Sequence, residues 1–276
     1  MPELFGFDAF SPREIAERIE NIGVAKARLP LLSMFMLGIL AGAFIGLGAL
    51  YFVLITSDPT PGFAMGRLLG GTGFSLGLLL VIVAGAELFT GNNLLVMAWA
   101  DGRLSTTEVL KNWGIVCTAN FLGAAGLALL VFLSGHPDMN NGLIAVQYQK
   151  IAAAKCALPF WSAFLRGLLC NVLVCMAVWM ASAGRSVTDK AVAIVFPISA
   201  FVAAGFEHSI ANMFLIPLGM LISSFGIPAA SIPPVTMYGF LHNLAAVILG
   251  NIAGGSLLVG LVYHVIYRRG SPERPP

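Results

Sequence analysis

Two long apolar stretches of this chain contain the same polar interruption. Residues 85–92 read Gly-Ala-Glu-Leu-Phe-Thr-Gly-Asn and residues 205–212 read Gly-Phe-Glu-His-Ser-Ile-Ala-Asn, so both follow the pattern G-x-E-x-x-x-small-N. A charged group is costly inside a membrane, and an ionisable residue there indicates a functional site. Such interruptions at corresponding places in two halves of a chain point to a transport site near the middle of the membrane.

The composition assigns the chain to the membrane proteins. It is 58% hydrophobic and only 10% charged, whereas a soluble domain carries about 25% charged residues. A net charge of +2 is too small to indicate a nucleic-acid partner. The four cysteines lack metal-ligand spacing, so no metal and no cofactor is expected.

Six stretches are long enough for membrane helices, which need about 20 apolar residues. They are Leu29–Thr56, Leu68–Ala100, Trp113–Leu133, Phe160–Ala183, Ala191–Ser223 and Met237–Tyr267. The second and the fifth contain the interruptions, and we predict two half-helices around an irregular break in each. Gly135–Ala153 is expected to be the longest outer loop. The expected domains are a cytoplasmic amphipathic helix (1–28), a transmembrane channel domain (29–267) and a cytoplasmic tail (268–276).

The two halves match beyond the interruptions. Asn112, Asn120 and Gly123 in the third segment are spaced as Asn243, Asn251 and Gly254 are in the sixth, with a constant offset of 131. Two repeats of three helices, about 29–134 and 160–267, must insert in opposite senses. The sequence therefore predicts an all-α fold with an inverted 3+3 repeat.

Basic residues predict the orientation of the chain. Lys and Arg are concentrated in the N-terminal segment, in the second-to-third and fourth-to-fifth connections and in the tail. The positive-inside rule then places both termini in the cytoplasm, in a multi-pass protein of the cell (inner) membrane. Residues 11–28 are expected to form an interfacial helix in which Ser11 is the N-cap, Pro12 the first helical residue and Glu14 part of a capping box. This helix is either a passive anchor or a gate over the cytoplasmic mouth.

Four residues are candidates for the substrate pathway. His208 lies at the second break and could hydrogen-bond an anion or exchange a proton with it, or it could be a neutral histidine that satisfies helix carbonyls. Thr90 at the first break can donate from its hydroxyl, or cap a half-helix. Asn171 could orient His208, line the pathway or bond a neighbouring helix. Lys155 could attract anions into a vestibule, or be a solvated loop lysine.

The remaining polar residues of the breaks have a structural interpretation. Glu87 and Glu207 are expected to bond backbone amides or basic groups and to stay off the permeation path. Asn92 and Asn212 are expected to cap half-helices or to close the breaks.

At this level of detail the chain resembles the formate/nitrite transporter family over about residues 8–267. The motifs that carry the resemblance are residues 85–92, 171–180, 205–213 and 250–255. The resemblance implies an aquaporin-like fold, a homopentamer with one pore in each protomer, and small monovalent anions as substrates. It assigns the central histidine to His208, the pore threonine to Thr90, the nearby asparagine to Asn171 and the vestibule lysine to Lys155. It also implies an outer hydrophobic constriction of Phe74, Leu78 and Phe201 and an inner one of Leu88, Phe89 and Val174.

The expected function is therefore transport of formate or nitrite, linked to protons through the central histidine. Features of both the formate and the nitrite branches are present, so hydrosulfide or another small monocarboxylate remains an alternative substrate. A water or glycerol pore is a second alternative, although neither repeat contains Asn-Pro-Ala. An enzyme is not expected, because HExxH and an aspartate pair in apolar segments are absent.

Overall fold

The computed structural model describes residues 9–226 and 231–269, and in these ranges the regular elements are all helical. Two 3₁₀ turns, η1 (Gly91–Leu94) and η2 (His136–Asp138), and one π-helical stretch, η3 (Ala253–Leu261), accompany the α-helices. The α-helices are α1 (Pro12–Ala27), α2 (Leu31–Thr56), α3 (Gly62–Ala84), α4 (Leu95–Ala100), α5 (Thr106–Leu133), α6 (Leu143–Cys156), α7 (Phe160–Ala183), α8 (Val187–Ala204), α9 (Ser209–Phe225), α10 (Met237–Ile252) and α11 (Val262–Tyr267).

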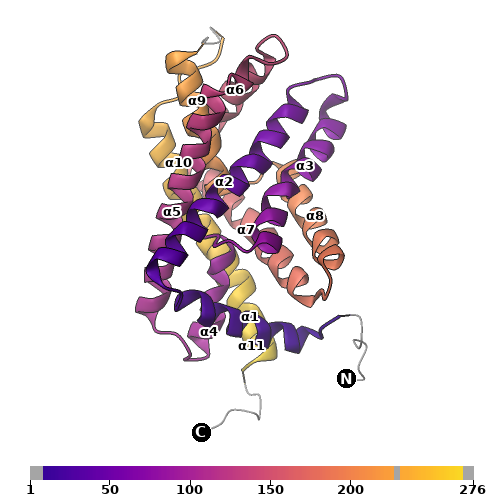
Figure 1. Cartoon of the computed structure of the whole chain (residues 1–276), viewed down its shortest axis with the longest axis vertical. Coiled ribbons are helices and arrows are strands. Elements are labelled where there is room, and N and C mark those ends of the chain that lie inside the picture. Colours follow the sequence, from indigo (N-terminus) through magenta and orange to yellow (C-terminus); the bar gives the residue numbers. More distant parts are fainter. Residues whose placement is uncertain (1–8, 227–230, 270–276) are drawn as a thin grey trace.

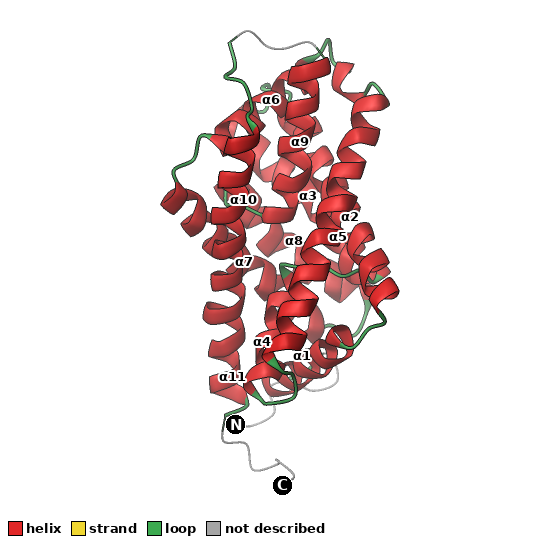
Figure 2. Cartoon of the chain, turned by 90° about the vertical axis from the view of Figure 1, so that its left-hand side faces the viewer, coloured by secondary structure: helices red, strands yellow, loops and turns green. Residues whose placement is uncertain are grey.

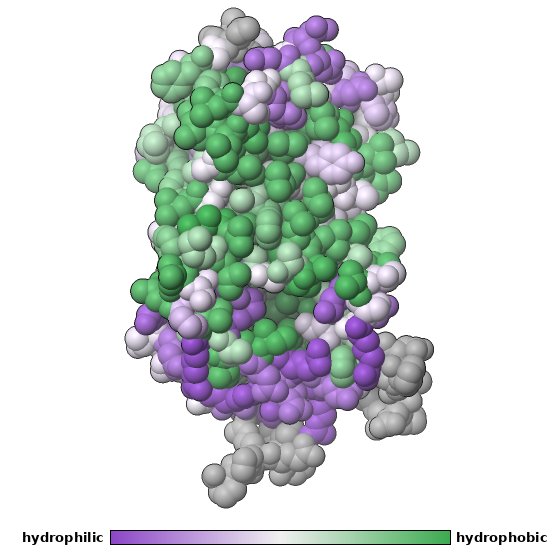
Figure 3. Space-filling model, viewed as in Figure 1, coloured by the Kyte–Doolittle hydropathy of each residue, from purple (hydrophilic) through white to green (hydrophobic). Residues whose placement is uncertain are grey.

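Six helical stretches are long and apolar enough to cross a membrane. They are α2, α3, α5, α7, α8 and the continuous run from Met237 to Tyr267. On the face that Figure 3 shows, apolar side chains form a broad belt, and polar side chains gather at the lower end and over part of the upper end. The predicted class, an all-α membrane protein with six spanning helices, is confirmed.

The second and the fifth membrane segments are broken, as predicted. Helices α1, α4 and α11 lie at one end of the molecule, which we call the α1 end, and α6 lies at the opposite end, the α6 end (Figures 1 and 2). Helix α3 enters from the α6 end and stops at Gly85, whereas α8 enters from the α1 end and stops at Gly205. Both glycines have positive φ angles, 81° and 75°, a left-handed conformation that residues with a side chain rarely adopt.

The predicted internal repeat is visible in how the helices pack. A Cβ atom on Gly123 would collide with the carbonyl oxygen of Ile39 on α2, and one on Gly254 would collide with that of Leu168 on α7. These glycines are the pair that the offset of 131 matches. Each lets two membrane helices approach closely, as small residues do in membrane proteins. Since α2 and α7 run in opposite directions, the repeats are inverted.

Two differences from the sequence expectation are large, at the start of α5 and in the predicted outer loop. Helix α5 begins at Thr106 rather than near residue 113, because the capping box of Ser105 and Glu108 starts it in a polar turn that hydropathy does not detect. The predicted outer loop 135–153 contains most of α6, whose buried Ile144, Tyr148 and Ala152 have helical spacing. Residues 270–276 of the predicted tail lie outside the described residues.

Helix α1 has the predicted start. Ser11 caps it, and the capping box with Glu14 is complete in both directions, with Pro12 as the first helical residue. Its buried face carries Ile15, Ala16 and Ile19, which pack with Leu94, Met97 and Trp179 in one apolar cluster. The helix is thus fixed to the α1 end of the membrane bundle.

Candidate functional site

Two cavities approach the middle of the molecule from opposite ends. The cavity at the α1 end has a volume of about 470 Å³, and the one at the α6 end has a volume of about 220 Å³. Gly85 and Leu88 of the first break line the α1-end cavity. Gly205 and His208 of the second break line the α6-end cavity. The two predicted breaks therefore lie where the cavities converge.

His208 and Thr90 meet between the two breaks. Nε2 of His208 lies 3.1 Å from Oγ1 of Thr90, and both side chains are buried. The two residues are 118 positions apart in the sequence, so only the inverted repeat brings them together. This hydrogen bond joins the first break to the second.

The other ring nitrogen of His208 caps helix α9. Nδ1 accepts a hydrogen bond of 3.2 Å from the backbone amide of Ala211, and so carries no proton. In the neutral ring the hydrogen then resides on Nε2, which donates to Thr90. The imidazole is thus oriented with its one donor toward Thr90 of the first break.

Asn171 supports Thr90 from α7. Its Nδ2 lies 3.2 Å from the Thr90 carbonyl oxygen, 2.8 Å from Oδ1 of Asn93 and 2.7 Å from the carbonyl oxygen of Asn251. Two hydrogens face three acceptors, so Asn171 has no donor left for an anion. These bonds hold the backbone of Thr90 in position. None of them joins Asn171 to His208.

A network of side chains holds the first break. Oδ1 of Asn120 accepts from the Phe89 amide at 2.9 Å, and its Nδ2 donates to the Glu87 carbonyl at 2.9 Å. The Glu87 carboxylate accepts from Asn92 at 2.8 Å and pairs with the Lys26 ammonium at 2.9 Å. The irregular backbone is thereby satisfied inside the protein, as membrane depth requires.

The same network holds the second break. Oδ1 of Asn251 accepts from the Ser209 amide at 3.0 Å, and its Nδ2 donates to the Glu207 carbonyl at 3.1 Å. The Glu207 carboxylate accepts from Asn212 at 2.7 Å and pairs with the Lys155 ammonium at 2.9 Å. Each group has its counterpart in the first break, down to the ion pair.

Lys26 is the residue of this network that the sequence analysis missed. It lies near the end of α1 and corresponds to Lys155 near the end of α6. Asn112 donates to the Lys26 carbonyl and Asn243 donates to the Lys155 carbonyl, so α1 and α6 belong to the repeat as well. The separation of 129 between the two lysines, close to the offset of 131 between the matched asparagines, was the available signal.

Lys155 lines the α6-end cavity, but its charge is not free. Oε1 of Glu207 lies 2.9 Å from its ammonium, and the side chains of Lys155 and Glu207 are 15% and 4% exposed. Glu207 lines the same cavity, and Glu87 lines the cavity at the α1 end. The pair therefore presents a dipole rather than a net charge, and the attraction of anions by Lys155 stays a prediction.

The six predicted constriction residues are all buried but occupy different places. Phe74 and Phe201 line the α6-end cavity, with ring centroids 5.6 Å apart in an edge-to-face arrangement. Leu78, expected beside them, instead lines the α1-end cavity with Leu88, because it lies one helical turn further along α3.

The other two predicted constriction residues line neither cavity. The ring of Phe89 packs edge-on against Trp113 at 6.4 Å. Val174 belongs to the main apolar core. Their constriction role stays a prediction, and the apolar lining found at the α1 end includes Leu78 and Leu88.

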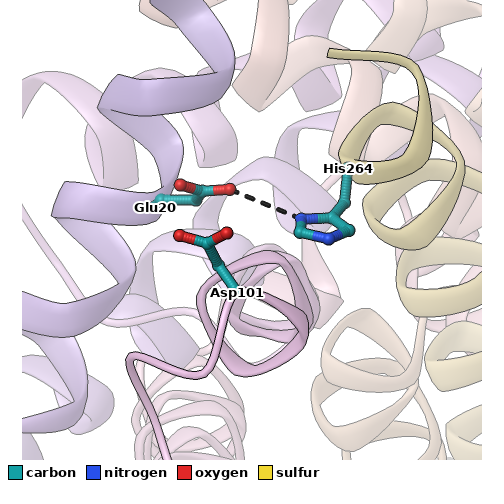
Figure 4. A group of neighbouring side chains, drawn as sticks. All are labelled: Glu20, Asp101 and His264. Carbon is teal, nitrogen blue, oxygen red and sulfur yellow. Dashed lines mark ion pairs between the residues drawn. The ribbon is translucent and has the colours of Figure 1, made fainter. Parts of the chain in front are cut away.

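A separate cluster of charges lies at the α1 end (Figure 4). Glu20 of α1 is fully buried and contacts Nδ1 of His264 at 3.6 Å, with Asp101 beside them. Burial raises the pKa of Glu20 to about 7. Three such residues could hold a metal ion, but the Arg268 guanidinium already binds Glu20 at 2.9 Å. We therefore interpret the cluster as a buried polar network that attaches α1 to α11.

Comparisons with known proteins agree with this architecture. The formate channel FocA of Escherichia coli strain K12 is 43% identical over 274 residues, which cover 95% of this chain and 96% of that protein. The formate channel FocA of Haemophilus influenzae is 39% identical over 266 residues, 92% and 93% of the two chains. A solved pentameric formate channel with formate bound superposes with a TM-score of 0.81 at 36% identity, over 86% of this chain and 97% of its own.

The family profile described as formate/nitrite transporter matches residues 13–265. This range begins in α1 and ends in α11, and so includes both breaks and both lysines of the repeat. The relatives named above are channels, and they are matched over nearly their whole length. The chain belongs to the formate/nitrite transporter family.

Proposed function

We propose that this chain is a formate channel whose pathway runs between the two cavities and passes His208. The observation that carries the proposal is the orientation of the imidazole: His208 borders the α6-end cavity and aims a single donor, Nε2, at Thr90 of the other break. An incoming carboxylate can replace the Thr90 oxygen as acceptor. The identity of 43% to a formate channel supports formate over the other anions, and nitrite is the second substrate to test.

In its neutral form His208 acts as a hydrogen-bond donor. Giving up the Nε2 proton to formate would leave an imidazolate unless Nδ1 first gained a proton. Protonation of Nδ1 breaks its bond to the Ala211 amide, and losing an N-cap costs about 1 kcal/mol. Passage of the formate anion past a neutral histidine is therefore the first form of the mechanism.

Proton-linked passage is the second form of the mechanism. The apolar pair Phe74 and Phe201 beside His208 favours it. Phe201 stacks on the imidazole with centroids 5.9 Å apart, and Phe74 packs against Phe201. A bare carboxylate that passes these two phenylalanines loses hydration, at a cost of several kcal/mol. Formic acid, which forms when His208 supplies a proton, avoids most of that cost.

The proposal extends to the oligomeric state of the protein and to its orientation in the membrane. We propose a homopentamer with one pathway in each protomer, since the solved relative is described as pentameric. The α1 end is proposed to face the cytoplasm of a cell whose inner membrane holds the protein, because Arg18, Lys26 and Lys190 line the cavity there.

Uptake of radiolabelled formate into proteoliposomes tests the proposal, with nitrite, hydrosulfide and glycerol as comparisons. His208→Asn keeps an N-cap residue for α9, whereas His208→Phe removes both the cap and the donor. We expect saturable formate uptake in the wild type, reduced uptake with an altered pH response in His208→Asn, and a larger loss in His208→Phe. Unchanged formate uptake in both variants would refute the role of His208.

A trapped pH indicator separates the two forms of the mechanism. With valinomycin and potassium present to remove any membrane potential, anion passage leaves the lumen pH unchanged, whereas proton-linked passage acidifies it in step with formate. Protein-free liposomes correct for formic acid that crosses the lipid. Glycerol uptake without formate uptake would instead identify a neutral-solute pore.

A further inference from the structure

Arg67 is a cation at the α6-end cavity that is bound to helix carbonyls instead of to a carboxylate. It lies in the second turn of α3 and is half-buried. Its Nε donates to the carbonyl of Ala203 at 2.9 Å, and its Nη2 donates to the carbonyl of Val202 at 2.7 Å. Its guanidinium also lies over the ring of Phe52, 5.6 Å from the centroid. The side chain is held from two sides.

The two acceptors of Arg67 belong to the last turn of α8. The final carbonyls of a helix have no partner within the helix and carry a partial negative charge. This helix end is adjacent to His208, because α8 stops at Ala204 and the break follows. Without a cation there, the carbonyls would repel an anion that approaches the imidazole. Arg67 cancels that repulsion at its source.

The charge balance of the α6-end cavity also depends on arginine. Lys155 and Glu207 neutralise each other. In the part of the chain that the structure describes, Arg67 and Arg166, which both line the cavity, take part in no ion pair. The net positive charge therefore comes from these two arginines and not from the lysine that sequence analysis singled out.

We propose that Arg67 is a specificity-determining residue that concentrates anions in the α6-end cavity and makes the end of α8 tolerant of negative charge. The inference deepens the proposed function and rests on it. A cavity with walls of low dielectric and one sign of charge raises the local concentration of the opposite ion. Arg67 lines the same cavity as His208, so it would raise the anion concentration next to the imidazole.

The alternative is that Arg67 only clamps α3 to α8. Arg67→Lys and Arg67→Gln distinguish the two roles. Lysine keeps the charge but is a point donor that cannot fork between two carbonyls. Glutamine keeps one donor group and removes the charge. A clamp is weakened by both changes, whereas an electrostatic role is lost only in Arg67→Gln.

The test measures initial formate uptake into proteoliposomes as a function of formate concentration. The assay is run at ionic strengths of about 0.01 M and about 0.15 M, where the screening length falls from about 30 Å to about 8 Å. Lys150→Gln is the matched control, because Lys150 is an exposed cation on α6 that does not line the cavity. Gel filtration and circular dichroism check the fold of each variant.

We expect Arg67→Gln to raise the half-saturating formate concentration about tenfold at low ionic strength, the lower end of the range for electrostatic focusing. The difference should shrink at the higher ionic strength, with Arg67→Lys and Lys150→Gln close to the wild type. Equal losses in Arg67→Lys and Arg67→Gln, or a loss that salt does not change, would overturn the proposal. Absence of formate uptake in the wild type would instead remove the proposed function.

Discussion

The buried ion pair of Lys155 and Glu207 predicts a specific pattern of stability. The Glu207 side chain is 4% exposed, and its carboxylate is bonded by the Lys155 ammonium and the Asn212 amide. Lys155→Met leaves that carboxylate buried without its counter-charge, and breaking one side of a buried pair costs about 3–5 kcal/mol. Because Lys155 borders a cavity, we expect Lys155→Met to lower the free energy of unfolding by about 3 kcal/mol, the lower end of this range.

The assay is thermal unfolding of the purified protein at one fixed heating rate. For a chain of this size about 1 kcal/mol corresponds to about 2–4 °C, so Lys155→Met should lower the apparent Tm by about 6–12 °C. The double variant Lys155→Met, Glu207→Gln removes both charges and keeps an acceptor for Asn212. It should recover most of the loss, leaving about 1 kcal/mol from an unpartnered amide.

Lys150→Met on the same helix is the control for loss of a cation, and as an exposed substitution it should change stability by no more than about 0.5 kcal/mol. The reasoning would be refuted if Lys155→Met kept the wild-type Tm. It would also be refuted if the double variant were less stable than Lys155→Met, because the two charges would then not be coupled.

Two further predictions concern α1 and the centre of the pathway. Burial raises the pKa of Glu20 from an ordinary 4.5 to about 7. The contribution of Glu20 to the attachment of α1 is therefore complete below about pH 4.5 and is lost as pH rises through about 7. Amide hydrogen exchange in α1, corrected for its intrinsic pH dependence, should therefore increase between about pH 6 and about pH 8 in the wild type and much less in Glu20→Gln. Asn171→Leu removes the donors of three buried acceptors, so Tm and formate uptake should fall together by amounts that reflect a loss of about 2–4 kcal/mol; reduced uptake at an unchanged Tm would contradict its positioning role.

Patterns that repeat along the chain could be predicted from the sequence. The offset of 131 identified Asn120 with Asn251, and the structure shows these two asparagines making the same bonds at the two breaks. Hydropathy located α7 to the residue, because its whole length is apolar. Hydropathy failed for α6, whose length of 14 residues and exposed polar face resemble a loop.

The site was predictable only as far as residue identity carried it. His208 and Thr90 were both recognised, but their hydrogen bond depends on how two half-helices of opposite direction meet. Leu78 lines the α1-end cavity whereas Phe74 lines the α6-end cavity, because one helical turn separates the two residues. No sequence pattern indicates the role of Arg67, because its acceptors are carbonyls 135 and 136 positions away.

The chemistry of the pathway lies where the inverted repeat is not symmetric. Glu87 and Glu207 match, as do the asparagines and the lysines that hold them, so the scaffold of each break is the same. Between these matched positions the residues differ, with Leu88 in the place of His208. An imidazole at both positions would place two groups that compete for the same acceptor in a buried space.

With leucine in the first repeat, the single donor of His208 faces Thr90, and each break contributes one polar atom to the pair. The α1-end cavity then ends in an apolar wall that includes Leu88, whereas the α6-end cavity ends at the imidazole. An anion therefore finds its hydrogen-bond donor directly from the α6 end, and from the α1 end only after crossing apolar side chains. The duplicated scaffold supplies rigidity, and in the proposed pathway the unequal residues within it make the energy profile asymmetric between the two ends.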